Sequence, residues 1–174
     1  SAFLTNIFNR LARSCFYGAA NVCDAHLPQV APHAEVVEAC RRATLEFERL
    51  AHGFDAHGAL AVAEELCRQE NKRWDDASKA AKGDDAAYEQ ALADAFCALR
   101  TVTLLMHPAV PSGCEKICEH MGFGAEEFFS WEHAFDGPVE LAATLGQTPV
   151  EHAIVPLPPR FDFFEKHPSQ VKKK

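Results

Sequence analysis

The sequence predicts an all-α protein, a helical bundle of about five helices followed by an extended C-terminal tail. Two observations support this fold class: apolar residues recur at spacings of three and four, and Ala and Leu dominate while runs of β-branched residues are scarce. With 174 residues, of which 48% are hydrophobic, the chain is long enough to bury a core of its own. We expect a bundle over residues 1–122 and a tail over residues 123–174.

The first two helices are predicted from their apolar stripes. The first covers residues 3–23 and begins almost at residue 1 with little room for a cap, so we expect the chain to be part of a longer protein. The second covers residues 36–51 and ends before Gly53, since glycine is the usual residue beyond a helix end.

Capping residues mark the next helices. Asp55 is a favourable N-cap for a third helix that runs to about Lys82, and Asp84 or Asp85 caps a fourth. The fourth helix ends at the His-Pro dipeptide of residues 107–108, because proline cannot continue the helical hydrogen bonds.

A short fifth helix is expected to follow a capping box formed by Ser112 and Glu115, and to end at Gly122. Beyond residue 123, repeated prolines and the absence of a sustained period predict an extended tail. Its three phenylalanines at 161, 163 and 164 would be costly to leave in water. We therefore expect the tail to pack back on the bundle or toward a missing catalytic domain.

Charge and composition exclude several classes of protein. The net charge of −8 provides no overall positive field for a polyanion, so contact with nucleic acid would have to be local. No apolar run is long enough to span a membrane and no signal peptide is visible. Seven cysteines without close pairing are typical of small buried hydrophobes in a reducing compartment, so we expect a cytoplasmic protein.

Motifs of catalysis are absent from the sequence. It contains no GxSxG, HExxH or GxxxxGK[ST] segment, and Cys114 and Cys118 lack the second cysteine pair that a structural zinc site needs. We expect no catalytic residue, metal ion or cofactor in this chain. A zinc-binding bundle remains a distant alternative.

The first helix carries a specific polar stripe. Asn6, Arg10, Arg13 and Tyr17 follow one another at i, i+4, i+7 and i+11, so they share one face opposite the apolar one. Asn and Arg can bond base edges, and Arg and Tyr can stack on bases, as single-stranded RNA recognition requires. The alternative is an ordinary solvated helix face.

Trp74 lies near the end of the third helix in a polar setting, directly after Arg73. An exposed indole there could stack on a base, whereas a half-buried tryptophan at the edge of the bundle is the structural alternative.

The order of these features resembles the anticodon-binding domain of class I aminoacyl-tRNA synthetases, most closely that of the methionyl-tRNA synthetases. The segment FLTNIFNRLAR matches the family's Asn-x-x-x-Arg helix opening through Asn6 and Arg10. Trp74 matches the family's tryptophan at the end of the third helix. The segments LLMHPAVPSGCEKICEHMGF, FFSWEHAF and VPLPPRFDFFE match its later turns, tryptophan and returning tail, so the resemblance covers residues 4–165.

The resemblance implies recognition of a CAU anticodon, with the wobble cytosine stacked on Trp74 and with base-edge contacts from Asn6 and Arg10. Arg13 and Tyr17 are further candidates on the same stripe. The chain departs from the family just before the tryptophan: Arg73, Glu65 and Cys67 occupy positions where the family has Pro, Asn and Tyr. Arg73 could compensate by contacting a phosphate.

The implied partners are the initiator and elongator methionine tRNAs and the catalytic domain of the same parent chain. That domain would bind ATP and ligate methionine to tRNA. Its signatures, His-x-Gly-His and Lys-Met-Ser-Lys-Ser, are absent here, so this chain is not expected to catalyse the reaction alone. Two alternatives remain: the related domain of a cysteinyl, leucyl, isoleucyl or valyl enzyme, and a helical protein-interaction module.

Overall fold

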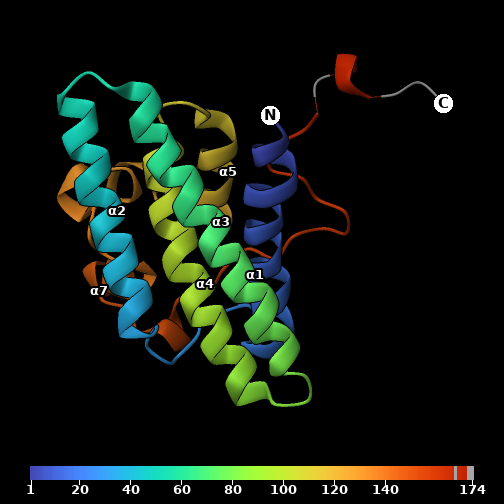
Figure 1. Ribbon diagram of the computed structural model, residues 1–174. Helices are drawn as coiled ribbons and strands as arrows, with labels where there is room; N and C mark the ends of the chain where they lie inside the picture. Colours follow the sequence, from blue (N-terminus) through green and yellow to red (C-terminus); the bar gives the residue numbers. More distant parts are fainter. Residues whose placement is uncertain (167, 172–174) are drawn as a thin grey trace.

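The computed structural model describes residues 1–166 and 168–171 and is an α-helical bundle (Figure 1). Its long helices are α1 (Asn9–Val22), α2 (Ala34–His52), α3 (Ala56–Ala80), α4 (Asp85–Met106) and α5 (Pro111–His120). A π-helical turn, η1 (Leu4–Phe8), leads directly into α1. Strands are absent from the described residues, which confirms the predicted all-α class.

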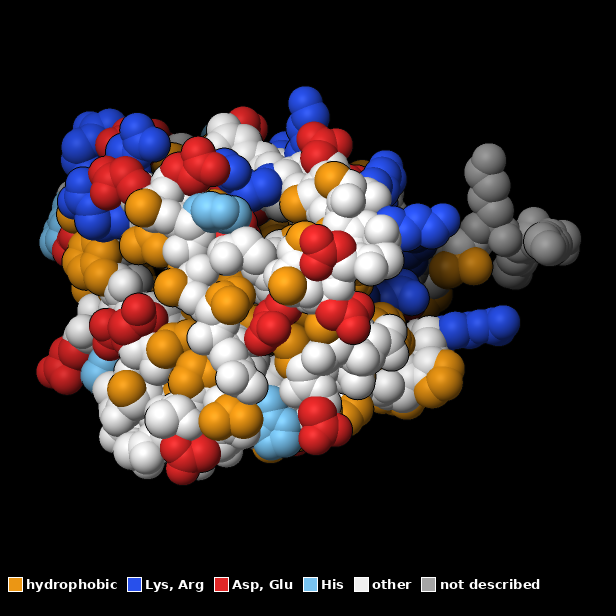
Figure 2. Space-filling model, turned by 90° about the horizontal axis from the view of Figure 1, so that it is seen from below, with side chains coloured by type: hydrophobic (Ala, Val, Ile, Leu, Met, Phe, Trp, Pro, Cys, Tyr) orange, Lys and Arg blue, Asp and Glu red, His pale blue; other side chains and the backbone are white. Residues whose placement is uncertain are grey.

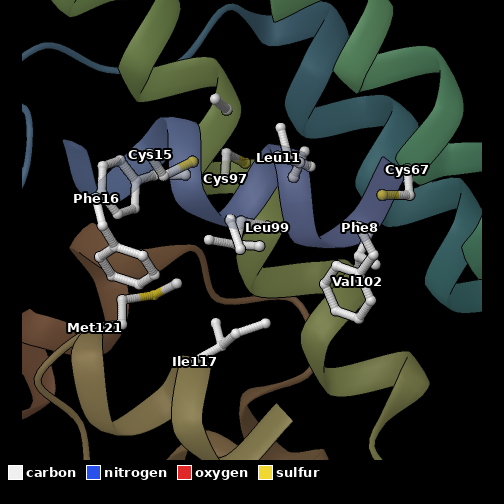
Figure 3. Packing of buried hydrophobic residues seen from close by; sticks show 14 of the residues in the cluster. Phe8, Leu11, Cys15, Phe16, Cys67, Cys97, Leu99, Val102, Ile117 and Met121 are labelled. Atoms are coloured by element: carbon white, nitrogen blue, oxygen red, sulfur yellow. The ribbon is translucent and has the colours of Figure 1, made fainter. Parts of the chain in front are cut away.

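Helix α4 is the centre of the bundle. Every residue from 91 to 106 is buried, and α4 packs against α1, α2 and α3. In Figure 3, apolar side chains of η1 and α1 pack together with those of α4 and with those at the end of α5. This part of the core contains Phe8, Leu11, Cys15, Phe16, Leu99, Val102, Ile117 and Met121. The seven cysteine thiols are free and six are buried, so they act as small core residues.

Two predicted N-caps are confirmed. The Asp55 carboxylate accepts from the Gly58 N–H at 2.8 Å, and the Asp84 carboxylate accepts from the Ala87 N–H at 3.1 Å. These bonds satisfy backbone donors that lack a partner in the first helical turn. Helix α3 ends at Ala80, slightly before the predicted end.

The predicted capping box of the fifth helix is wrong. Helix α5 begins at Pro111 with Val110 as its N-cap, so Ser112 is already inside the first turn. Proline fits this first position because the N–H that it lacks would have no helical partner there.

The region after residue 123 is more ordered than the extended tail predicted for it. It forms α6 (Ala125–Phe128), α7 (Pro138–Thr144) and the 3₁₀ turns η2 (Trp131–His133), η3 (Pro149–Glu151) and η4 (Pro168–Gln170). Each piece is too short to show a helical period in the sequence. The division into segments at residue 122 remains a prediction.

Residues 154–164, here called the returning segment, pass across α1. The rings of Phe163 and Phe164 are buried, with Phe163 5.6 Å from Phe16 and Phe164 4.8 Å from Phe8 between ring centroids. Gly113 permits this packing, since a Cβ atom there would lie 2.1 Å from the Phe164 ring. Within this structure the phenylalanines thus pack on the bundle.

Among the residues that the structure describes, none of the helices combines the length and the apolar character that crossing a membrane demands.

Candidate nucleic-acid interface

An open groove of about 660 Å³ lies between α1 and α3, which run side by side in the same direction (Figure 1). Its lining comes mainly from η1 and α1, together with Trp74 of α3 and Tyr88 of α4. Five of the six residues singled out from the sequence line this groove: Asn6, Arg10, Arg13, Tyr17 and Trp74. The fold thus joins the polar stripe of η1 and α1 to the tryptophan of α3.

The two arginines of the stripe are already paired. Arg10 Nη2 lies 2.8 Å from the Asp75 carboxylate of α3, and Arg13 Nη1 lies 3.3 Å from the carboxylate of Asp162 in the returning segment. The Arg10 side chain is 55% exposed and that of Asp75 is 24% exposed. Partly exposed ion pairs of this kind contribute little to stability, so an incoming anion or base edge can exchange with the carboxylate.

The returning segment also fixes Tyr17 and Asn9. The Tyr17 hydroxyl donates to the Pro158 carbonyl at 2.7 Å, which leaves the ring half-buried against the groove. Asn9 is buried, donates to Asp162 at 2.7 Å and accepts from the Phe163 N–H at 2.8 Å. Asn9 was not among the residues predicted from the sequence, because its role depends on contacts with residues 162 and 163, far along the chain.

Trp74 is not the exposed platform that one interpretation expected. Its side chain is only 7% exposed and its ring lies 5.3 Å from that of Tyr88 at 75°, an edge-to-face contact. Gly18 helps to bring α4 this close, because a Cβ atom there would lie 2.6 Å from Leu92 and 3.3 Å from Tyr88. Burial raises the pKa of the Tyr88 hydroxyl. Tyr88 is a groove residue that no sequence pattern indicated.

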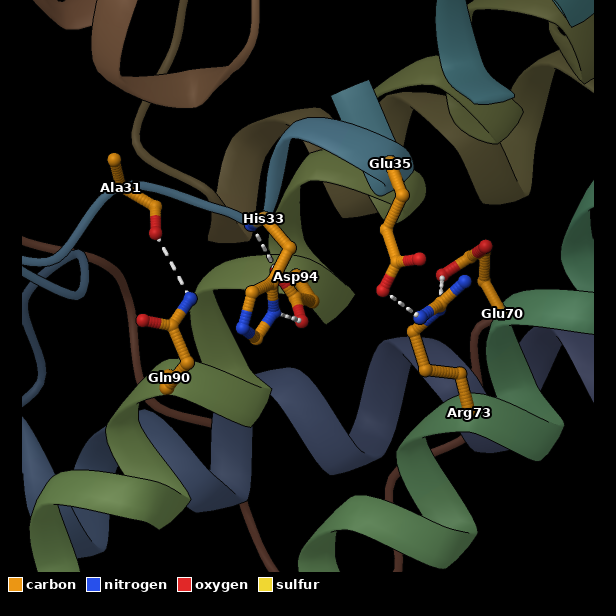
Figure 4. A network of polar contacts seen from close by, with 7 residues as sticks. All are labelled: Ala31, His33, Glu35, Glu70, Arg73, Gln90 and Asp94. Atoms are coloured by element: carbon orange, nitrogen blue, oxygen red, sulfur yellow. Dashed lines mark hydrogen bonds and ion pairs between the residues drawn. The ribbon is translucent and has the colours of Figure 1, made fainter. Parts of the chain in front are cut away.

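Arg73 lies outside the groove. Its Nη1 is 2.9 Å from Glu35 of α2 and its Nε is 3.0 Å from Glu70 of α3, on another face of the helix (Figure 4). Successive helical residues point about 100° apart, so Arg73 and Trp74 cannot share a face. The predicted phosphate contact of Arg73 therefore has no support in the structure.

Glu70 is the buried partner in this contact. Burial raises the pKa of its carboxyl, and the charge of Arg73 opposes that rise. The pair thus holds a carboxylate inside the bundle and is structural.

Seen from below in Figure 2, Lys and Arg side chains lie along the upper and right-hand borders of the molecule. Asp and Glu side chains lie among those at the upper border and are scattered over the rest of this face. In residues 1–166 and 168–171, no group of three His, Cys, Asp or Glu side chains could hold a metal ion.

The fold defined by these helices is that of a part of the methionyl-tRNA synthetases. The chain superposes on the Mycobacterium tuberculosis enzyme in complex with methionyl-adenylate with a TM-score of 0.66 at 19% identity. For the apo form of that enzyme the TM-score is 0.68 at 20% identity, and for a second methionyl-adenylate complex it is 0.70 at 21% identity.

These matches cover 92–95% of this chain but only 31–32% of the synthetase chains. The chain thus spans about a third of their length. No family model and no curated protein sequence matches it. At this level of identity the comparison establishes the fold.

Proposed function

We propose that this protein is a tRNA anticodon-binding domain of the methionyl-tRNA synthetase type, which holds the CAU anticodon in the groove between α1 and α3. The observation that carries the proposal is the convergence of Asn6, Arg10, Arg13, Tyr17 and Trp74 on one groove. These residues lie on η1, α1 and α3. They offer hydrogen-bond donors, an acceptor, cations and aromatic rings, the groups that recognise unstacked bases.

Asn6 and Arg10 are assigned to base edges. Both are exposed at the same end of the groove, and the Arg10 guanidinium can present two donors to a base once it leaves Asp75. The affinity of the free groove is therefore reduced by the cost of separating this ion pair.

Trp74 is assigned to the wobble cytosine. Because its indole is buried, stacking requires a neighbour to move, and Tyr88 is the adjacent groove residue with a partly exposed side chain. We propose that Tyr88 swings aside as the base enters, so that anticodon binding is accompanied by a local rearrangement.

In this function the chain supplies recognition only. Catalysis, with ATP and methionine, belongs to another domain of the parent enzyme, and methionine tRNA is the partner of both. The returning segment of residues 154–164 is assigned to orienting the polar stripe, since it bonds Asn9, Arg13 and Tyr17.

Equilibrium binding of RNA hairpins at low salt tests the proposal. A hairpin with CAU in its loop is compared with one whose wobble cytosine is replaced, for the wild type, Asn6→Ala and Arg10→Gln. Loss of one base contact is worth about 1–3 kcal/mol, so each variant should lose at least about fivefold in affinity for the CAU loop. Arg41→Gln is the matched control, because Arg41 is equally exposed and paired, with Glu38 of α2.

Equal binding of both hairpins would contradict CAU recognition. Absence of RNA binding would favour a protein-interaction module. A loss in Arg41→Gln as large as that in Arg10→Gln would show that only total charge matters.

A further inference from the structure

The groove continues beyond the predicted residues. A second hollow of about 510 Å³ shares Asn21, Trp74 and Tyr88 with the first and reaches the turn of residues 81–84 between α3 and α4. Helices α1 and α3 both end near this turn, at the lower end of Figure 1. From Asn6 to Asn21 the path along η1 and α1 is about 22 Å at the rise of an α-helix, which is long enough for several nucleotides.

Two lysines line the far end of this path. Lys79 is in the last turn of α3 and Lys82 is in the turn that follows, where basic residues are favoured by the helix dipole. Both are exposed, and in the described part of the chain neither forms an ion pair. The one carboxylate that lines the hollow is that of Asp85.

The two ends of the path therefore differ in the state of their cations. Arg10 and Arg13 each have a carboxylate partner, whereas Lys79 and Lys82 have none among the residues that the structure describes. A phosphate that binds a free ammonium releases a counterion from the RNA. When RNA displaces a carboxylate from an arginine, the carboxylate takes up a cation from solution, which offsets that release.

We infer that Lys79 and Lys82 form a phosphate-binding end of the groove, which holds the backbone of the bound RNA strand while the Arg10 end reads its bases. The chemistry fits this division: an ammonium is a point charge suited to phosphate, and a guanidinium is a planar fork suited to base edges. The inference rests on the proposed function and adds the location of the electrostatic contacts.

The test is the salt dependence of hairpin binding by the whole chain. Affinity for the CAU hairpin is measured over a series of KCl concentrations for the wild type and for the double variant Lys79→Gln/Lys82→Gln. Each lost phosphate contact lowers the magnitude of the slope of log K against log [KCl] by about 0.7, so the double variant should lose about 1.4. Its preference for CAU over the altered loop should remain.

The double variant Lys72→Gln/Lys116→Gln is the control. It removes the same charge from two exposed lysines that line neither hollow, and should keep the wild-type slope. Arg10→Gln should show the opposite pattern to Lys79→Gln/Lys82→Gln. It should lose the preference for the CAU loop with little change in the slope of log K against log [KCl].

Two results would overturn the inference while CAU preference persists: an unchanged slope in Lys79→Gln/Lys82→Gln, or an equal fall in the control. If the wild type binds no hairpin at any salt concentration, the proposed function fails and the phosphate site fails with it.

Discussion

Helix α3 has two polar faces that differ in what their charges do. On the groove side, Arg10 meets the exposed edge of α3 through Asp75, and both side chains remain open to solvent. On the side toward α2, Arg73 meets Glu70, whose side chain is only 3% exposed. Trp74 of α3 thus lines the groove, whereas Arg73, the residue before it, belongs to a structural contact with Glu70.

The structural side extends to a second buried carboxylate, Asp94 of α4. It accepts from the backbone N–H and from the ring Nδ1 of His33, each at 2.7 Å, and so fixes the start of α2 (Figure 4). Gln90, one turn earlier on α4, donates to the Ala31 carbonyl at 2.8 Å. Asp94 thus joins α4 to the start of α2, and Arg73 joins the buried Glu70 of its own helix to Glu35 of α2. The half-exposed pairs of the groove, in contrast, can exchange partners.

The largest expected effect is on stability, from Trp74→Ala. Removing a buried aromatic ring should lower the free energy of unfolding by about 3 kcal/mol or more, measured by urea denaturation. Trp74→Phe should cost clearly less, because it keeps much of the apolar contact with Tyr88. A cost below about 1 kcal/mol for Trp74→Ala would show that the indole is loosely packed. The groove side of α3 would then contribute little to the stability of the bundle.

Arg73→Met should come next, with a loss of about 2 kcal/mol in the free energy of unfolding. It leaves the buried Glu70 without its charged partner, and protonation of that carboxyl limits the loss. RNA affinity and its salt slope should stay at wild-type values. Arg41→Met, which breaks an exposed pair with Glu38, should change stability by less than about 0.5 kcal/mol. A reduced salt slope in Arg73→Met would return Arg73 to the RNA site.

A smaller effect is expected in binding from Asp75→Asn. Freeing Arg10 from its carboxylate should tighten CAU hairpin binding by up to about fivefold, since an exposed ion pair is worth about 0.2–1 kcal/mol. Asp76→Asn carries the same charge change at the next, exposed position and should have less effect. Equal tightening by both variants would indicate a general effect of net charge.

The smallest effect concerns pH. The hydrogen bond to Asp94 and its charge raise the pKa of His33 above its ordinary value. The pKa of His33 is therefore higher in the folded state than in the unfolded state. Its contact with Asp94 contributes fully to stability below about pH 6.5, and this contribution is lost as pH rises through the folded-state pKa. His33→Asn should remove this part of the pH dependence of urea unfolding between about pH 5.5 and about pH 8.5. Identical pH profiles for the two proteins would contradict it. Glu70 titrates in both proteins, so its contribution cancels.

The sequence by itself determined the five long helices, the cap at Asp55, and the polar stripe of η1 and α1. These features depend on residues within a few positions of one another, because helical periodicity and capping are local. The stripe could therefore be read before any fold was known, and so could the resemblance that named Trp74.

Tertiary structure decided everything that depends on contacts between distant residues. It buried Trp74 against Tyr88, turned Arg73 toward Glu35, and gave Arg13 the carboxylate of Asp162. It also joined the α1 groove to Lys79 and Lys82. The physical reason is that burial and charge pairing are properties of the space between packed helices, and no spacing along one helix specifies which neighbour fills it.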